Sequence, residues 1–281
     1  MIYVSSLAFG KRTVKEISDL AIGQKLNLEF SSSLPYSSEN EEVFFAHTGE
    51  KRIHNYFPAP EDPFVLNLAS GNDEIRNRTI DHCMKAMDMT ARAGTRYFSV
   101  HAGFCIDPQP GELGRPLNTS VDFDRTRHWK LFLSSVRLLL KRAVELDLEL
   151  YIENNVLAGF NYTNNINALF CCDSMEMESL ISQIGHPRLG ILLDTAHLKV
   201  SANTLNFDLD QAVQTVMPYV KVIHHSDNDG LTDTNQPFDE AYWFLSHMSD
   251  FERVDHVIEV RNIDSATIKQ MSDLLRINMS K

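Results

Sequence analysis

Four side chains of the kinds that bind divalent metals each end a short apolar segment in the second half of the chain: Glu153 ends LYIE, Asp194 ends ILLD, His224 ends VKVIH and Glu259 ends HVIE. If these segments lie side by side, three carboxylates share one poorly hydrated site, where they repel one another and take up protons. A divalent cation removes this conflict and uses all four side chains as ligands. Three oxygens and one imidazole nitrogen suit Mn²⁺, Mg²⁺, Co²⁺ or Zn²⁺ without choosing among them.

The elements that would bring these residues together are short strands that alternate with helices. Eight runs have the apolar, β-rich pattern of strands, at residues 2–6, 25–31, 64–70, 97–103, 148–154, 190–196, 220–226 and 256–260. Segments with apolar residues three and four apart lie between them, most clearly at 73–93, 125–146 and 265–277. A further helix is predicted to begin at Asp173, where DSME has the pattern of a capping box with Glu176.

Strand alternating with helix eight times predicts a parallel (β/α)₈ barrel, a TIM barrel, formed as a single domain by residues 1–281. In such a barrel every strand opens at its carboxyl end onto the same mouth, so residues distant in sequence converge there. An open, doubly wound sheet is the alternative, but it usually has a glycine-rich turn after its first strand, and SSLAFGKR is not one. The long segments 104–124 and 156–172 follow strands, and are expected to cover the mouth.

Further polar residues fall near the same strand ends. Glu29 follows the apolar run of the second predicted strand, His101 ends SVH on the fourth, and His197 lies three residues after Asp194. Each alone is more often structural than functional, but their number at strand ends favours a site. The weaker candidates are Asp227, Asp233 and His225, and we expect His225 to point away from His224 and to be structural.

Composition favours a small-molecule partner. The 281 residues carry a formal net charge of −12 and no dense run of Lys or Arg, whereas nucleic-acid binders usually present a basic face. No apolar stretch is long enough to cross a membrane, and the first residues do not have the pattern of a signal peptide. The four cysteines contain no CxxC pair and are expected to be reduced thiols of a cytoplasmic protein.

At these residues the sequence resembles the xylose isomerase-like barrel superfamily, which includes endonuclease IV and sugar isomerases and epimerases. PFVLNLAS (63–70) is similar to the third-strand segment of endonuclease IV, and LLDTAH fits its Asp-x-x-His pair with Asp194 and His197. HHSDNDG (224–230) is similar to the seventh-strand motif of many epimerase-like members, and IEN and IEV fit the two glutamate strands.

The departures from endonuclease IV bear on the metal content. That enzyme uses three zinc ions, but here Glu61 stands where its third-strand histidine is expected, and Asp233-Thr234-Asn235 stands in place of its Asp-x-His. Glu61 and Asp233 would then belong to vestigial metal positions. The four-ligand site shared with the epimerases is complete, so the resemblance implies one divalent metal ion and a sugar or sugar phosphate rather than abasic DNA.

The resemblance also implies a mechanism. Glu153 and Glu259 would transfer the proton on either side of an enediolate that the metal stabilises, and His197 and His101 would bind substrate oxygens, as Glu29 would. The arginine that ketose 3-epimerases carry after the seventh-strand histidine is absent from SDNDG, so Arg115 is the candidate cation for an acidic or phosphorylated sugar. A dehydratase of a polyol ketone, a phosphodiesterase on abasic DNA and a non-catalytic sugar-binding barrel are the alternatives, and a homo-oligomer is compatible with all of them.

Overall fold

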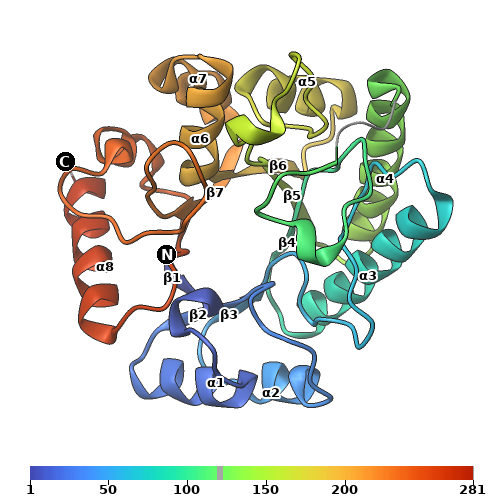
Figure 1. The fold of residues 1–281 in the computed structure, drawn as a ribbon. Helices are drawn as coiled ribbons and strands as arrows, with labels where there is room; N and C mark the ends of the chain where they lie inside the picture. The colour runs from blue at the N-terminus through green and yellow to red at the C-terminus, as the bar shows by residue number, and fades with distance from the viewer. Residues whose placement is uncertain (119–122, 281) are drawn as a thin grey trace.

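The computed structural model describes residues 1–118 and 123–280. Eight parallel strands form one sheet in the order β3-β2-β1-β8-β7-β6-β5-β4, and a bridge between His54 and Ser99 links β3 to β4. Figure 1 looks along the axis of the resulting ring, with the helices around it. The protein is therefore a (β/α)₈ barrel with a single domain, as predicted. The strands are β1 Ile2–Ser5, β2 Asn27–Phe30, β3 Lys51–Ile53, β4 Tyr97–His101, β5 Glu149–Glu153, β6 Leu189–Asp194, β7 Val220–His225 and β8 Asp255–Ile258.

The helices predicted at residues 73–93, 125–146 and 265–277 and from Asp173 are confirmed, and four others bring the α-helices of the described residues to eight. They are α1 Val14–Gly23, α2 Asn40–Ala46, α3 Asp73–Arg92, α4 Arg125–Glu145, α5 Ser174–Ile184, α6 Thr195–Leu205, α7 Leu209–Val216 and α8 Ser265–Met279. Asp173 caps α5 by accepting a hydrogen bond from the backbone N–H of Glu176, as predicted. The second half of the expected capping box is absent, because the Glu176 carboxylate instead contacts Arg125 and the backbone N–H of Cys171.

The prediction of the third strand is wrong. Residues 64–70 form no strand, and β3 is Lys51–Ile53, which pairs with β2. The backbone of 64–70 is held by side chains instead of a ladder: the N–H of Phe64 donates to the Tyr56 hydroxyl and that of Asn67 to Thr79 Oγ1. Its apolar residues belong to a packed loop, whereas the true strand carries two charged residues and shows no apolar run.

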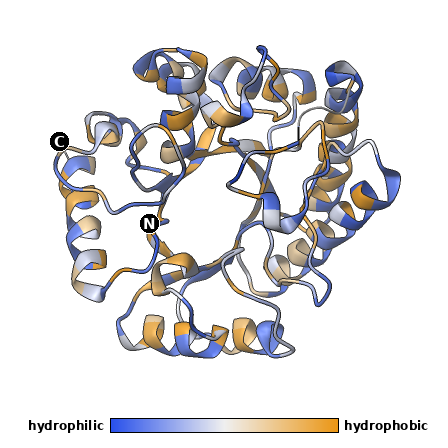
Figure 2. Ribbon diagram, in the orientation of Figure 1, coloured by the Kyte–Doolittle hydropathy of each residue, from blue (hydrophilic) through white to orange (hydrophobic). Residues whose placement is uncertain are grey.

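The barrel interior is filled in layers because successive side chains of a strand alternate between its two faces. One apolar cluster inside the ring is separate from the larger core between strands and helices, and it consists of Tyr3, Tyr97, Tyr151, Leu192, Val222 and Val257. Figure 2 shows the apolar residues concentrated on the strands and on stripes of the surrounding helices. Two residues further along the same strands come the polar side chains Ser5, Ser99, Glu153, Asp194, His224 and Glu259, which therefore form the next layer toward the mouth.

The opposite end of the barrel is closed by Arg52. Its guanidinium lies 3.3 Å from the ring centroid of Tyr3 and 4.6 Å from that of Tyr97. One of its nitrogens is 3.0 Å from a carboxylate oxygen of Asp255, whose other oxygen is 2.8 Å from the amino group of Met1. Stacking and ion pairing together seal this end.

The pairing of β6 with β7 contains one irregularity. Ile191 pairs with Val220 while Leu192 pairs with Val222, which leaves Lys221 as one extra residue in β7. The shift sets the alternation so that Val222 and His224 point into the barrel.

No helix among the described residues is long and apolar enough to cross a membrane. The four cysteines all lie within the described residues, are buried and form no disulfide bond.

Candidate metal centre

The four predicted ligands meet at the mouth of the barrel. Glu153 and Asp194 are the last residues of β5 and β6, His224 lies near the end of β7, and Glu259 follows β8. One ligand atom from each side chain can be chosen so that all four atoms lie within 4.8 Å of one another. The first three residues are fully buried. The strand ends therefore place the four groups as the sequence analysis predicted.

Two oxygens of this cluster lack a hydrogen-bond donor. Within the described part of the chain, Glu153 Oε1 and Asp194 Oδ2 accept no hydrogen bond, whereas Glu153 Oε2 lies close to His54 and His101. Leaving a buried charged acceptor without a partner costs several kcal/mol, so such atoms are rare. A divalent cation among them would supply the missing partner, and the donor set of three carboxylates and one imidazole fits such an ion.

Local hydrogen bonds fix the position of Asp194 and leave one of its carboxylate oxygens without a hydrogen-bond donor. It caps α6, where its Oδ1 accepts a hydrogen bond of 2.7 Å from the backbone N–H of His197. The side chain of Asn154 accepts from the Asp194 N–H at 2.7 Å and donates to its carbonyl at 3.0 Å. Asn154, which follows β5, thus fixes the backbone of Asp194, while Asp194 Oδ2 points to the cluster.

The charges of the cluster shift one another's pKa values. Burial raises the pKa of Asp194 to about 7, against the opposing effect of His197. Burial would lower the pKa of His224, but the carboxylates of Glu259 and Glu29 outweigh it and raise the pKa well above its usual value. Burial would raise the pKa of Glu153, but the nearby His101 and His54 hold it well below its usual range. Carboxylate and imidazole protonation is thus strongly coupled, as in sites that bind a cation.

Sequence reasoning missed His54. It follows β3 and its Nε2 lies 3.0 Å from Glu153 Oε2, while His101 Nε2 lies 3.2 Å from the same oxygen. His54, His101 and Glu153 form a second group that could hold a metal ion, and Glu29, His54 and His224 form a third. Glu153 belongs to two of the three groups.

The interpretation of Glu61 as a vestigial ligand is therefore wrong. Glu61 is exposed in the loop after β3 and belongs to none of the candidate groups, because the strand that should carry the ligand lies earlier in the chain. His54, directly after β3, belongs to two of the candidate groups. Its signal was the short segment KRIH before an aromatic and proline-rich loop.

Asp233 lies beside His197. Its Oδ2 is 3.3 Å from His197 Nε2, and the Nδ1–H of His197 donates to the carbonyl of Asn154 at 2.9 Å. Asn235, which stands at the position of a histidine in endonuclease IV, has its Nδ2 3.4 Å from Asp233 Oδ1. Among the described residues this pair belongs to no group of three potential ligands.

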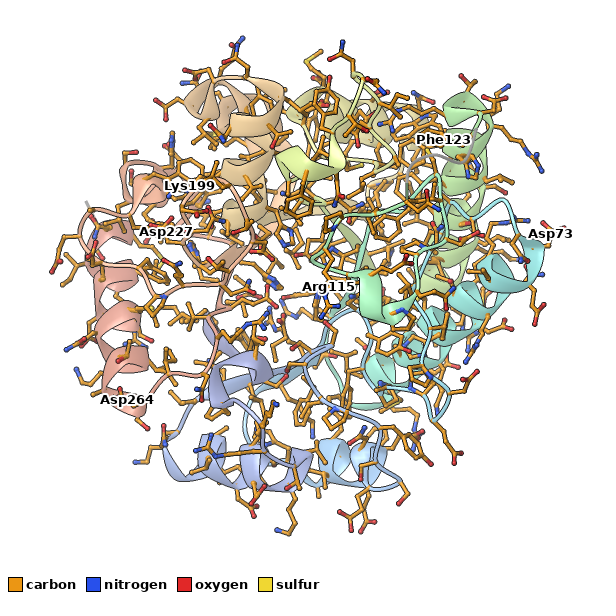
Figure 3. All side chains as sticks on the ribbon, in the orientation of Figure 1. Asp73, Arg115, Phe123, Lys199, Asp227 and Asp264 are labelled. Carbon is orange, nitrogen blue, oxygen red and sulfur yellow. The ribbon has the colours of Figure 1, made fainter. Side chains whose placement is uncertain are left out.

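Arg115 and Glu29, the other two candidate substrate-binding residues, lie in different surroundings. Arg115 is exposed on the loop after β4 (Figure 3), and it is not part of the wall of the cavity described below. Glu29 is fully buried beside His224, with 3.3 Å between Glu29 Oε2 and His224 Nε2, and it does not reach that cavity either.

The weaker candidates are explained by structural contacts. Asp227 pairs with Lys199 at 2.6 Å, and the two are labelled side by side in Figure 3. His225 points out of the barrel as predicted, where its Nε2 is 2.9 Å from His256 Nδ1 and its Nδ1 is 3.1 Å from the Tyr242 hydroxyl.

A cavity of about 540 Å³ lies beside the cluster, and none of the four predicted ligands is in its wall. His101 and His197, which both approach Glu153, contribute to its wall. Loops after β3, β4 and β5 supply most of the remaining wall, including parts of 104–124 and 156–172. The two long segments thus cover the mouth over their described residues, as expected.

Comparisons with known proteins agree with this fold. A D-tagatose 3-epimerase-like protein superposes with a TM-score of 0.74 at 16% identity, over 99% of this chain and 97% of that one. The apo form of a 3-keto-D-glucoside 4-epimerase from E. coli gives 0.66 at 14%, over 100% and 99%. A protein from Thermus thermophilus soaked with ZnCl₂ gives 0.66 at 17%, over 97% of each chain. At these identities the likeness establishes the fold alone.

Comparison with curated protein sequences gives no match. The family model described as "Xylose isomerase-like TIM barrel" matches residues 20–273, which is most of the sequence. This chain therefore belongs to the xylose isomerase-like TIM barrel family.

Proposed function

We propose that this protein is a metal-dependent isomerase or epimerase of a sugar or sugar-like polyol, acting by proton transfer at a carbon beside a carbonyl group. One observation carries the proposal: Glu153, Asp194, His224 and Glu259 converge at the mouth with carboxylate oxygens left without donors, beside a cavity large enough for a small carbohydrate. The similar structures named as sugar epimerases support the same reaction class.

The four converging residues would hold the ion. When bound, a divalent cation polarises a carbonyl oxygen and offsets the negative charge of an enediolate. Glu153 and Glu259, which come from β5 and β8, would then act as the proton-transfer pair, one removing the proton and the other returning it.

His197 and His101 would bind substrate oxygens, because both contribute to the cavity wall. The Nδ1–H of His197 donates to a backbone carbonyl, which fixes the ring and leaves Nε2 toward Asp233 and the cavity. Asn154 would position Asp194 rather than contact substrate, since both ends of its amide bind the Asp194 backbone.

The test is Glu259→Gln, assayed by deuterium uptake from heavy water into D-tagatose or D-fructose in the metal-loaded protein. The variant should keep its fold and lose turnover by roughly 10²–10⁴-fold, since proton transfer to or from a positioned side chain contributes about that much. Glu252→Gln, which changes an exposed glutamate outside the cluster, is the matched control and should behave as the unmodified protein does. Near-normal activity of Glu259→Gln, or of fully chelated protein, would refute the assignment.

A phosphodiesterase acting on abasic DNA is the second candidate, and His54 is the observation that favours it. With His54 in place, the described residues form three overlapping groups of potential metal ligands at the mouth, which brings the site nearer to a multi-metal phosphodiesterase. The net charge of −12 opposes binding to a polyanion. Metal content measured on purified protein, together with incision of an abasic duplex, separates the two: several zinc ions and salt-sensitive incision would replace the isomerase proposal.

A further inference from the structure

The cavity above the cluster has two unlike sides. The loops after β3, β4 and β5 present mainly apolar side chains to it, among them Tyr56, Phe64, Phe104, Leu113 and Phe160. The residues after β6, β7 and β8 are polar, and they are His197, Thr232, Asp233 and Arg261. A ligand that fills the whole space must therefore be polar at one end and apolar at the other.

Charge is confined to the polar side. Asp233 and Arg261 are the only Asp, Glu, Lys or Arg residues in the described wall of this cavity, and both follow the last two strands. Polar groups on the apolar side are partly committed to the protein itself. Asn161 Oδ1 accepts from the N–H of Leu117 at 2.8 Å, and the Asn155 amide donates to the carbonyls of Ala102 and Phe170. The described wall therefore carries one acidic and one basic residue, both on the polar side, and no Lys or Arg on the apolar side.

Two of its apolar side chains are left largely in water. Leu113 is 50% exposed and Phe160 is 40% exposed, and they stand on the loops after β4 and β5. Covering apolar surface is favourable by about 25 cal/mol per Å², so an apolar ligand group that lies against them would bind more tightly.

The volume of the cavity also indicates a ligand that has an apolar part beside its polar part. At about 540 Å³ the cavity lies within the range of about 300–1,000 Å³ typical of pockets for drug-sized ligands, which are larger than a single sugar ring. A free monosaccharide held at the metal cluster would leave the apolar side unfilled.

We infer that the ligand is a neutral carbohydrate with an apolar substituent, such as an aryl or alkyl group in glycosidic linkage. Its carbohydrate end faces His101, His197 and the metal cluster, and its apolar substituent lies on Leu113 and Phe160. The orientation rests on the proposed function, but the preference for an apolar substituent is a property of binding and can be measured without turnover.

The experiment compares three probes by calorimetry on the metal-loaded protein: methyl β-D-glucoside, phenyl β-D-glucoside and methyl β-D-glucuronide. The phenyl glucoside should bind roughly tenfold or more tightly than the methyl glucoside, as expected when apolar groups of this size fill a hydrophobic pocket. Its binding should show a more negative heat-capacity change, which marks apolar burial. The glucuronide, which carries a carboxylate, should gain nothing over the methyl glucoside.

Two variants locate the effect. Phe160→Ser and Leu113→Ser should each remove most of the advantage of the phenyl glucoside over the methyl glucoside. Leu138→Ser is the matched control, because Leu138 is 47% exposed on α4, away from the cavity. Equal affinities for the two glucosides, a tighter glucuronide, or an advantage that survives both variants would overturn the inference.

The outcomes also separate this inference from the proposed reaction. A preference for the phenyl glucoside without proton exchange in any keto sugar would leave the apolar subsite standing and refute the isomerase. Turnover of free ketoses without a preference for the phenyl glucoside would support the isomerase and refute the apolar subsite.

Discussion

The two ends of the barrel interior both contain buried charge without complete hydrogen bonding, and they differ in what surrounds it. At the mouth the unpartnered atoms are carboxylate oxygens of Glu29, Glu153 and Asp194, which approach common centres. At the opposite end they are Nε and Nη1 of Arg52, whose guanidinium is covered by the faces of Tyr3 and Tyr97. A missing hydrogen bond alone therefore does not mark a functional site. Convergence of like charges does, because it needs a further charge to be stable.

The sharpest test of this contrast uses two glutamates of one strand. Glu153 ends β5 at the mouth, while Glu149 begins it and binds the Tyr151 hydroxyl. Glu153→Gln should abolish metal binding and lower turnover by roughly 10²–10⁴-fold, because it removes a ligand and a proton-transfer group together. Glu149→Gln should change neither. Mass spectrometry measures the metal content and the deuterium-uptake assay measures turnover. Equal losses of metal and turnover in the two variants would show that the two ends of the barrel do not differ in this way.

The next largest effect is expected at the closed end, on stability alone. Arg52→Met should lower the free energy of unfolding by about 3 kcal/mol, since it leaves Asp255 without its buried partner and the tyrosines without a cation. Metal binding should be unchanged. Urea titration measures the first and calorimetric metal titration the second, with Arg253→Met, at an exposed position, as the control. Loss of metal binding in Arg52→Met would show that the two ends are not independent.

The smallest expected effect is a pH dependence at the closed end. Burial would raise the pKa of Asp255, but Arg52 and the chain's amino group outweigh it and lower the pKa. A carboxyl group with a lowered folded-state pKa stabilises the fold above its unfolded-state pKa, about 4, and this stabilisation is lost as the pH falls through the folded value. Below about pH 4 the unmodified protein should therefore lose stability more steeply than Asp255→Asn. Parallel curves from urea unfolding would show that the ion pair contributes nothing.

The parts of the fold that sequence predicted share a physical cause. In β5 to β8 the residues just before the carboxyl end are apolar, so Glu153, Asp194, His224 and Glu259 each end an apolar run and are conspicuous. Apolar residues three and four apart predicted the helices α3, α4 and α8.

The sequence did not predict the third strand, because the residue that this strand directs into the barrel is a cation. Arg52 is stable there only through Tyr3, Tyr97 and Asp255, which come from β1, β4 and β8, and no local pattern reports such partners. Residues 64–70 are apolar for a different reason, since they form a packed loop beside the cavity. With the strand misplaced, His54 was overlooked, and the site was taken to have one complete group instead of three overlapping ones.

The extra residue in β7 determines which insertions and deletions in this strand leave the site intact. Lys221 has no partner in β6, so removing it would leave Val220 beside Ile191 and Val222 beside Leu192, with the pairing on both sides intact. A one-residue deletion between Val222 and His224 has the opposite result. It turns His224 to the helix side and His225 into the barrel, away from its partners His256 and Tyr242, because strand side chains alternate in direction. Insertions and deletions in this family should therefore be found at the irregular position, and not in the two residues that precede the histidine.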